Sequence, residues 1–187
     1  MESDFKKCIQ FLKKGGVILY PTDTIWGIGC DAENFQAVER IYTIKMRPEN
    51  KSMIILLDDV KKLDLYVEKV HPIDYELIRK YHEPLTIIYP NAKNLAKNVI
   101  AKDDTIAIRI VRDEFCKQLI KQFGKPIVST SANVSRENTP LTFSKIPESI
   151  KDKMDYIVKH GQERVGQFKA STIIKISETG DFTTIRK

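Results

Sequence analysis

The chain has 187 residues, of which 42% are hydrophobic and 30% are charged, as is typical of one globular domain over residues 1–187. Lys and Arg number 31 against 25 Asp and Glu, and the resulting net charge of +6 modestly favours anionic ligands such as nucleotides or RNA. The spacing of Cys8, Cys30 and Cys116 argues against a disulfide framework and a structural zinc site. No apolar run reaches the roughly 18 residues of a membrane span, so we expect a cytoplasmic protein.

The first third of the chain alternates helical and strand patterns. Apolar residues at helical spacing follow Ser3, and the apolar run at 17–20 is typical of a short buried strand. In chain order we expect a helix to about residue 14, strands over 17–20 and 26–32, a second helix, and a buried strand over 52–59. The second helix would be capped by Asn34, would have Phe35 on its apolar face and would end at about Lys45.

The rest of the chain continues this alternation and adds two late strands. We expect helices near 59–67, 72–82 and 113–123, strands over 84–90, 105–110 and 125–133, and two final strands over 171–176 and 182–187. Interleaved strands and helices define the α/β class, and the late pair indicates a mixed sheet.

Two cations lie two residues apart where the second helix meets a proline. Pro48 disfavours the helical conformation at Arg47, so we expect an extended exit on which Lys45 and Arg47 point the same way. Two converging cations repel each other unless an anion lies between them, and a phosphate fits this pair. The alternative is that Lys45 only complements the negative end of the helix.

Short polar side chains at period-two spacing form two further candidate segments. Ser129, Ser131 and Asn133 would line one side of an extended chain, where they suit phosphate oxygens or a ribose. Thr22 and Thr24 would face alike in the PTDT segment. For both segments the alternative is a cap or turn with local backbone hydrogen bonds.

Arg109 interrupts the otherwise apolar strand TIAIRI. A cation in a central strand needs a partner or a ligand, whereas an exposed edge strand would leave it in water, and the sequence leaves both open. The three histidines lack metal-site spacing, and no P-loop or Ser-His-Asp pattern is present.

The chain contains five polar or strand segments in a fixed order: YPTDTIWGIGCDA, IKMRPENKSM, PLTIIYP, TIAIR and STSANVS. As a set they resemble the YrdC/TsaC family, over about residues 10–176. The resemblance implies a twisted mixed sheet with flanking helices around a basic cavity. It also implies the nucleotidyltransferase reaction of a threonylcarbamoyl-AMP synthase. That reaction uses L-threonine, bicarbonate and ATP and serves the threonylcarbamoyladenosine modification of tRNA.

The resemblance assigns roles residue by residue. ATP would be bound by Lys45, Arg47, Lys51, Thr105, Ser131, Asn133, Thr139 and Ser171. Threonine would be bound by Thr24, Ser129 and Arg109, with the guanidinium of Arg109 on the threonine carboxylate. Lys45 and Arg47 would be catalytic, because with ATP-bound Mg²⁺ they would stabilise charge on the reacting phosphate. No protein metal site is implied.

The sequence departs from the family pattern at four places, which include HEPLT at 82–86 in place of the usual PGPxT and ASTI at 170–173 in place of ESTV. Arg136 stands where a glycine is usual, and Leu56 stands where a histidine is usual. The resemblance leaves it open whether these changes alter the substrate.

The family resemblance also implies partners and competing functions. A synthase would supply the downstream proteins that transfer the threonylcarbamoyl group to tRNA, and it would need no membrane. The positive charge and the family's described affinity for double-stranded RNA make a non-catalytic RNA- or tRNA-binding module the alternative. A carbamoyl-AMP-forming enzyme, as in hydrogenase maturation proteins, is a third possibility.

Overall fold

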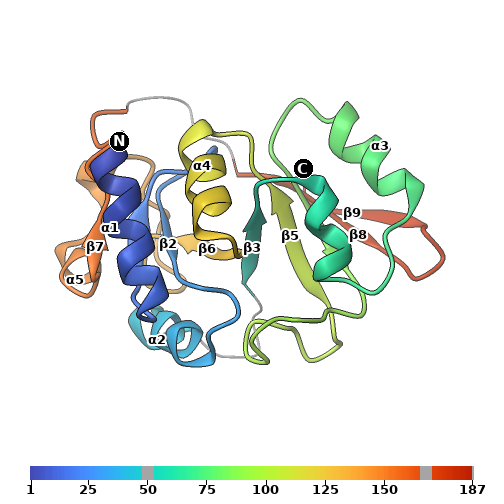
Figure 1. Ribbon diagram of the computed structural model, residues 1–187, viewed down its shortest axis with the longest axis horizontal. Helices are drawn as coiled ribbons and strands as arrows, with labels where there is room; N and C mark the ends of the chain where they lie inside the picture. Colours follow the sequence, from blue (N-terminus) through green and yellow to red (C-terminus); the bar gives the residue numbers. More distant parts are fainter. Residues whose placement is uncertain (48–52, 165–169, 187) are drawn as a thin grey trace.

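The computed structural model describes residues 1–47, 53–164 and 170–186. The strands in these ranges are β1 (Ile18–Tyr20), β2 (Gly27–Gly29), β3 (Ile54–Leu57), β4 (Leu85–Tyr89), β5 (Ile106–Ile110), β6 (Ile127–Ser131), β7 (Tyr156–Ile157), β8 (Thr172–Ile176) and β9 (Phe182–Arg186). They form one sheet in the order β7-β1-β2-β6-β3-β5-β4-β8-β9 (Figure 1). The polar STSAN segment therefore begins in a central strand, β6.

Strand β6 is shared between the two halves of the sheet. Its first part pairs antiparallel with β3, where Ser129 is opposite Ile54. Its last part pairs antiparallel with β2, where Ser131 is opposite Gly27. The pairs β3–β5, β4–β8 and β1–β7 are parallel, whereas β1–β2, β4–β5 and β8–β9 are antiparallel. The predicted mixed sheet is confirmed.

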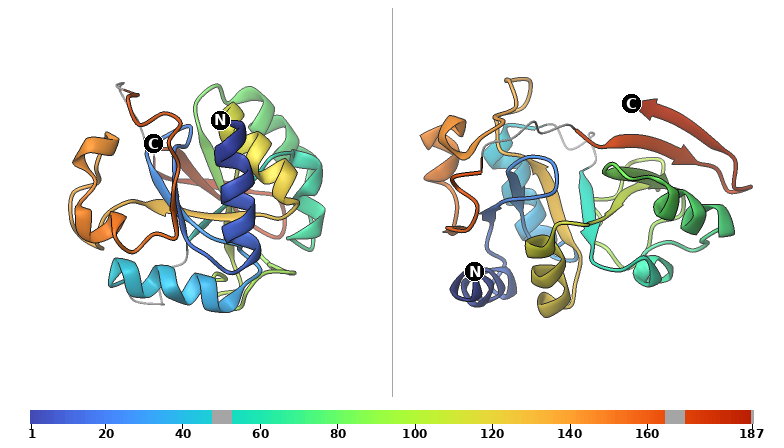
Figure 2. Two further views of the ribbon diagram at one scale, coloured as in Figure 1. Left: turned by 60° about the vertical axis from the view of Figure 1, so that its left-hand side comes forward. Right: turned by 90° about the horizontal axis from the view of Figure 1, so that it is seen from above.

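Helices lie on both sides of this sheet. They are α1 (Glu2–Lys13), α2 (Phe35–Lys45), α3 (Pro72–Lys80), α4 (Glu114–Phe123) and α5 (Glu148–Lys151), with the 3-10 helices η1 (Val60–Leu65) and η2 (Phe143–Lys145). Helices α1 and α4 lie side by side on one face, where the rings of Phe5 and Phe115 stack with centroids 5.0 Å apart. Helix α5 lies on the other side of the sheet (Figure 2).

Side-chain caps fix where α2 and α4 begin. Asn34 accepts a hydrogen bond from the backbone N–H of Ala37, as the sequence predicted, and Asp113 accepts one from Cys116. The predicted burial of Phe35 is wrong, because this side chain is 46% exposed. As the first residue of α2 it lies roughly a quarter turn from the centre of the buried face.

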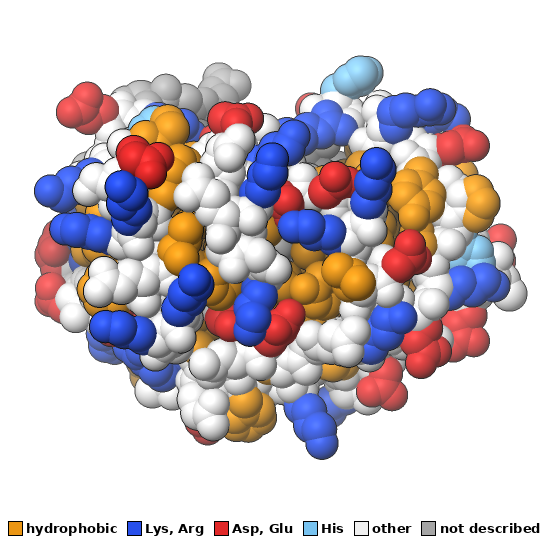
Figure 3. Space-filling view, in the orientation of Figure 1, with side chains coloured by type: hydrophobic (Ala, Val, Ile, Leu, Met, Phe, Trp, Pro, Cys, Tyr) orange, Lys and Arg blue, Asp and Glu red, His pale blue; other side chains and the backbone are white. Residues whose placement is uncertain are grey.

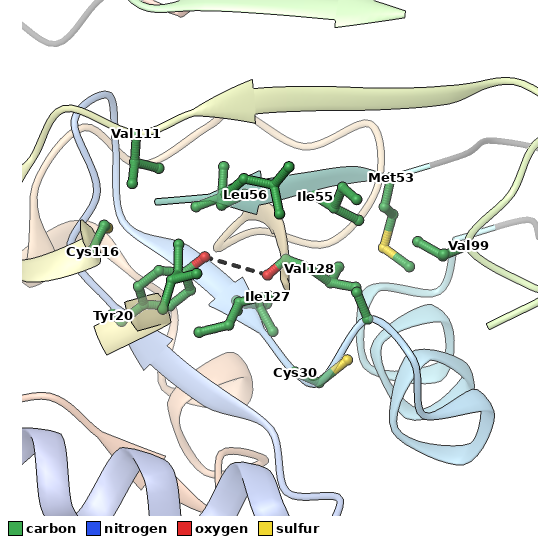
Figure 4. Packing of buried hydrophobic residues seen from close by; sticks show 14 of the residues in the cluster. Tyr20, Cys30, Met53, Ile55, Leu56, Val99, Val111, Cys116, Ile127 and Val128 are labelled. Carbon is green, nitrogen blue, oxygen red and sulfur yellow. Dashed lines mark hydrogen bonds between the residues drawn. The ribbon is translucent and has the colours of Figure 1, made fainter. Parts of the chain in front are cut away.

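A dense core fills the space around β1, β2 and β6. Tyr20 is fully buried, and its hydroxyl donates to the carbonyl of Val128 at 3.3 Å (Figure 4). Gly29 makes room for the Tyr20 ring, because a Cβ at this position would lie 2.6 Å from Tyr20 Cε1. The three cysteines are buried and have free thiols.

The surface over α1 and α4 carries charges of both signs. Figure 3 shows Lys and Arg side chains spread over this face with Asp and Glu side chains between them. None of the helices in the described ranges combines the length and hydrophobicity that crossing a membrane requires.

Candidate active site

Two cavities adjoin where α2 and β6 end. The basic cavity, of about 590 Å³, is lined by the cations Lys45, Arg47 and Arg136 and by residues that include Ser131, Asn133, Glu137 and Thr139. The hydroxyl cavity, of about 490 Å³, is lined by residues that include Thr22, Thr24, Ser129, Ser171 and Arg186. Arg47, Ser131 and Thr139 line both cavities and form a shared wall.

Lys45 is buried at the last residue of α2, and its ammonium group reaches the end of β6. It donates to the backbone carbonyls of Ser131 and Asn133 at 2.5 and 2.6 Å. Burial, followed by the nearby charge of Arg47, lowers the pKa of Lys45 to about 8. Lys45 therefore holds the end of β6 in place and also brings positive charge to the basic cavity.

The expected extended exit from α2 is wrong. The helix ends because Met46 adopts the left-handed conformation with φ of 49°, and the N–H of Arg47 donates back to the carbonyl of Tyr42 at 2.9 Å. Lys45 and Arg47 therefore lie on either side of a tight turn, and both still line the basic cavity. Pro48, on which the expectation rested, lies outside the described residues.

Asn133 organises the loop that follows β6. Its side-chain amide donates to the carbonyls of Val134 and Glu137 at 2.9 and 2.8 Å. The N–H of Ser135 donates to the carbonyl of Lys45 at 2.8 Å, which attaches this loop to α2. Asn133 Oδ1 is buried and has no hydrogen-bond partner among the described residues, so a ligand donor such as a ribose hydroxyl can satisfy it.

The threonines of the PTDT segment form a directed chain of hydrogen bonds. Thr22 Oγ1 donates to the carbonyl of Ile25 at 2.6 Å, so at 3.0 Å it accepts from the hydroxyl of Thr24. Thr24 Oγ1 in turn accepts from Arg109 Nη1 at 3.4 Å. The turn proposed as the alternative is also present, because Thr24 N donates to Thr22 Oγ1 at 3.1 Å. Thr24 thus presents its remaining lone pair as an acceptor to the hydroxyl cavity.

Arg109 lies in the protein interior, behind Thr24. Because β5 runs between β3 and β4, the alternative of an exposed edge strand is wrong. Arg109 Nη2 forms an ion pair with Asp23 Oδ1 at 3.1 Å, and the two side chains are only 5% and 9% exposed. Burial raises the pKa of Asp23, and the charge of Arg109 opposes that shift. The guanidinium of Arg109 is thus paired with the carboxylate of Asp23, whereas the resemblance implied that it would pair with the carboxylate of the substrate threonine.

Four further predicted residues lie in the cavity walls. Ser129 lines the hydroxyl cavity, and Ser131 and Thr139 belong to the shared wall. Ser171 also lines the hydroxyl cavity, and its hydroxyl forms a hydrogen bond with Thr86 Oγ1 at 2.8 Å. The structure therefore brings together residues that are far apart in the sequence.

Other positions named from the sequence lie elsewhere. Thr105 donates to Asp103 Oδ1 at 2.7 Å, and within the described ranges it lines neither cavity. Leu56 is fully buried in β3, where its side chain packs in the core. Lys51 lies outside the described residues.

Arg186 is a further cavity residue to which no sequence motif pointed. It lies in β9, and its Nε and Nη2 donate to the carbonyl of Ser171 at 3.2 and 2.9 Å. Arg186 reaches the hydroxyl cavity because β9 folds back on β8, a pairing that a single strand pattern does not encode. In the sequence, only the alternation of side chains between the two faces of strand β9 could have indicated that Arg186 is a cavity residue.

The described part of the chain contains no group of three or more His, Cys, Asp or Glu residues placed to hold a metal ion. Glu137 brings one carboxylate to the basic cavity.

The sequence and the fold match one protein family. The Sua5/YciO/YrdC family model, described as telomere recombination, matches residues 10–187, so the chain belongs to this family. A threonylcarbamoyl-AMP synthase from Pseudoalteromonas translucida is 38% identical over 160 residues, which cover 84% of this chain and 86% of that protein. One from Saccharophagus degradans is 37% identical over 128 residues, covering 68% of this chain and 67% of that protein.

Solved structures show the same fold. E. coli YciO matches with a TM-score of 0.85 and 25% identity, over 100% of this chain and 90% of that chain. P. abyssi Sua5 complexed with L-threonine matches with a TM-score of 0.85 and 26% identity, over 94% of this chain and 52% of that chain. The chain thus spans about half the length of that Sua5. The family resemblance found in the sequence is confirmed.

Proposed function

We propose that this protein is an L-threonylcarbamoyladenylate synthase, which converts L-threonine, bicarbonate and ATP to threonylcarbamoyl-AMP and pyrophosphate. The observation that carries the proposal is the shared wall of Arg47, Ser131 and Thr139 between two cavities of different character. Joining an amino acid to a nucleotide requires two binding sites whose reacting atoms meet. Relatives of 37% and 38% identity that are named threonylcarbamoyl-AMP synthases support this assignment.

The basic cavity suits ATP. Lys45 and Arg47 supply positive charge, and the unpartnered Asn133 Oδ1 would accept a hydrogen bond from a ribose hydroxyl. The α-phosphorus would lie at the shared wall, where Arg47 would stabilise the charge that builds up on its oxygens. Mg²⁺ would enter with ATP as part of the substrate, on the side of the cavity that carries Glu137.

The hydroxyl cavity suits threonine, the ligand in the solved Sua5 complex. The hydroxyl oxygen of Thr24 can accept a hydrogen bond from the amine or the hydroxyl of the substrate threonine, because its own proton is donated to Thr22 and Arg109 donates to it. Arg47 and Arg186 also line this cavity, so the threonine carboxylate would lie toward one of them. Arg109 would then act through Thr24 and not by direct contact.

The chemistry follows from this placement. Bicarbonate takes up a proton and loses water to give carbon dioxide; the threonine amine then adds to the carbon of carbon dioxide and releases a proton, which gives a carbamate. A carbamate oxygen attacks the α-phosphorus, the bond to the bridging oxygen breaks, and pyrophosphate leaves. No step needs a covalent protein nucleophile, so positioning and charge stabilisation would supply the catalysis. The product would pass to the proteins that transfer the threonylcarbamoyl group to tRNA.

The test is a reconstituted reaction with purified protein. Threonylcarbamoyl-AMP and pyrophosphate, detected by mass spectrometry and a phosphate-release assay, should form only when threonine, bicarbonate and ATP are all present. Failure of a folded, ATP-binding protein to form the product would overturn the proposal.

Arg47→Ala should lower the rate of this reaction at least 100-fold, roughly the effect of removing one donor that stabilises transition-state charge. The matched control is Arg79→Ala, which removes an exposed arginine of α3 outside both cavities. A rate for Arg47→Ala equal to that of the control would rule out its assigned role.

A further inference from the structure

Arg136 occupies a backbone position that is unfavourable for an arginine. Its φ is +74°, in the left-handed region, where glycine is tolerated and a side chain is strained. The surrounding loop enforces this conformation, because Asn133 Nδ2 bonds the carbonyls of Val134 and Glu137 on either side. The N–H of Glu137 also donates to the carbonyl of Val134 at 3.1 Å.

The side chain of Arg136 lines the basic cavity and is exposed there. Within the described residues it has no hydrogen bond and no ion pair. The ammonium of Lys45, by contrast, already donates to the carbonyls of Ser131 and Asn133. The guanidinium of Arg136 therefore brings a planar set of donors to the cavity, and this geometry suits two phosphate oxygens at once.

The position of Arg136 along the cavity defines which phosphate it would meet. Arg47, Ser131 and Thr139 line both cavities, whereas Arg136 lines the basic cavity alone. If the α-phosphorus lies at the shared wall, a polyphosphate chain that continues into the basic cavity would bring its β- and γ-phosphates toward the exposed Arg136 and the neighbouring Glu137, the side on which a phosphate-bound Mg²⁺ would lie.

We propose that Arg136 binds the β- and γ-phosphates of the nucleotide and makes the site selective for a triphosphate over a monophosphate. This inference rests on the proposed placement of ATP. The loop already fixes the backbone of Arg136, so little backbone freedom is lost there when the ligand binds, and only the exposed side chain has to be ordered. The strained backbone at Arg136 lowers stability, but the side chain adds a third cation to the cavity beside Lys45 and Arg47.

The substitution Arg136→Gly separates the effect of Arg136 on stability from its effect on phosphate binding. It should raise the melting temperature of the ligand-free protein, because glycine adopts this φ without strain. It should also weaken binding of ATP and of inorganic pyrophosphate about tenfold or more, as expected for the loss of charge-assisted hydrogen bonds. Binding of AMP should change less than about twofold, since AMP lacks the distal phosphates.

The measurements are thermal unfolding without ligand and calorimetric titration with ATP, inorganic pyrophosphate and AMP. Arg136→Lys keeps the charge and loses the planar fork, so its affinity for ATP should be intermediate. Arg79→Ala controls for the loss of one positive charge far from the cavity and should leave all three affinities unchanged.

Two results would overturn the inference. One is an Arg136→Gly variant that binds ATP and pyrophosphate as tightly as the wild type. The other is an equal loss for AMP and ATP, which would place Arg136 away from the distal phosphates. Because the titrations need no turnover, a protein that shows the predicted selectivity but forms no threonylcarbamoyl-AMP would contradict the proposed function alone.

Discussion

Lys45 shows how one residue serves both the fold and the site. Its ammonium holds the end of β6 through two carbonyls, and its charge contributes to the basic cavity. Burial of this charge is unfavourable, which is why its pKa falls to about 8. Activity and stability should consequently respond to pH in opposite directions.

In the wild type, kcat/KM for ATP should fall as the pH rises through about 8, because the free enzyme then loses the charge of Lys45. Lys45→Arg keeps its charge and should move this decline to higher pH. Profiles of pyrophosphate release against pH test the expectation. A decline at the same pH in both proteins would assign the titration to another group.

Stability should change with the opposite sign. The folded pKa of Lys45, about 8, lies below its ordinary value of 10.5, so between these values the unfolded chain binds more protons. The free energy of unfolding should therefore rise with pH in this window. Urea unfolding near pH 8 and near pH 10 should show the wild type gaining stability relative to Lys45→Met. A constant difference between the two proteins would contradict the assignment.

Residue patterns predicted which side chains matter better than they predicted what each one contacts. Period-two spacing placed Thr22 with Thr24 and Ser129 with Ser131, because strand geometry is local. The partner of Arg109 was not predictable, since Asp23 is distant in the sequence and meets it only across the folded sheet.

At the level of elements, the glycines of β2 differ in what they make room for. A Cβ on Gly29 would lie 2.6 Å from both Tyr20 Cε1 and the carbonyl of Val128. A Cβ on Gly27 would meet the flexible Ser129 Oγ at 3.1 Å, at the wall of the hydroxyl cavity. Gly29 thus supports core packing, and Gly27 shapes the cavity.

Gly29→Ala should destabilise the protein by about 3 kcal/mol, the upper end for overpacking against backbone and an aromatic ring. Gly27→Ala should cost less stability and should raise KM for threonine, because its methyl group narrows the hydroxyl cavity. Chemical unfolding and threonine-dependent kinetics on both variants measure this contrast. Equal losses of stability would show that both glycines are required by the core.

Most elements were predictable because caps and apolar periodicity are local signals. Asn34 and the apolar run expected as a strand over 52–59 each marked an element within a few residues of its observed bounds. The end of α2 was predicted at the correct residue for a different reason: Met46 turns into the left-handed region, whereas the expectation relied on Pro48. A left-handed methionine has no sequence signature.

For the whole molecule, the shared wall predicts coupling between the two ligands. ATP at about 100 times its Kd should stabilise the fold by roughly 2.7 kcal/mol, through its preference for the native state. If threonine and ATP contact the same wall, their joint effect on the melting temperature should exceed the sum of the separate effects. Thermal unfolding with each ligand and with both tests this expectation. Simple additivity would show that the sites are independent.

The family and the mixed sheet could be predicted from five ordered motifs, but the walls of the cavities could not. Arg186 joins the hydroxyl cavity only through the pairing of β8 with β9. Sequence order carries no information about such a contact unless the register is known.

Strand β6 also governs how the molecule would open. It joins β7-β1-β2 on one side to β3-β5-β4-β8-β9 on the other, and its five residues divide their pairing between them. If the hydrogen bonds of this strand break locally, the two halves of the sheet can move relative to each other as separate units. A nucleotide and an amino acid that both contact Ser131 would stabilise the pairing of β6 with the two halves of the sheet. Amide hydrogens along β6 should therefore exchange with solvent far more slowly in the doubly liganded protein than in the free one.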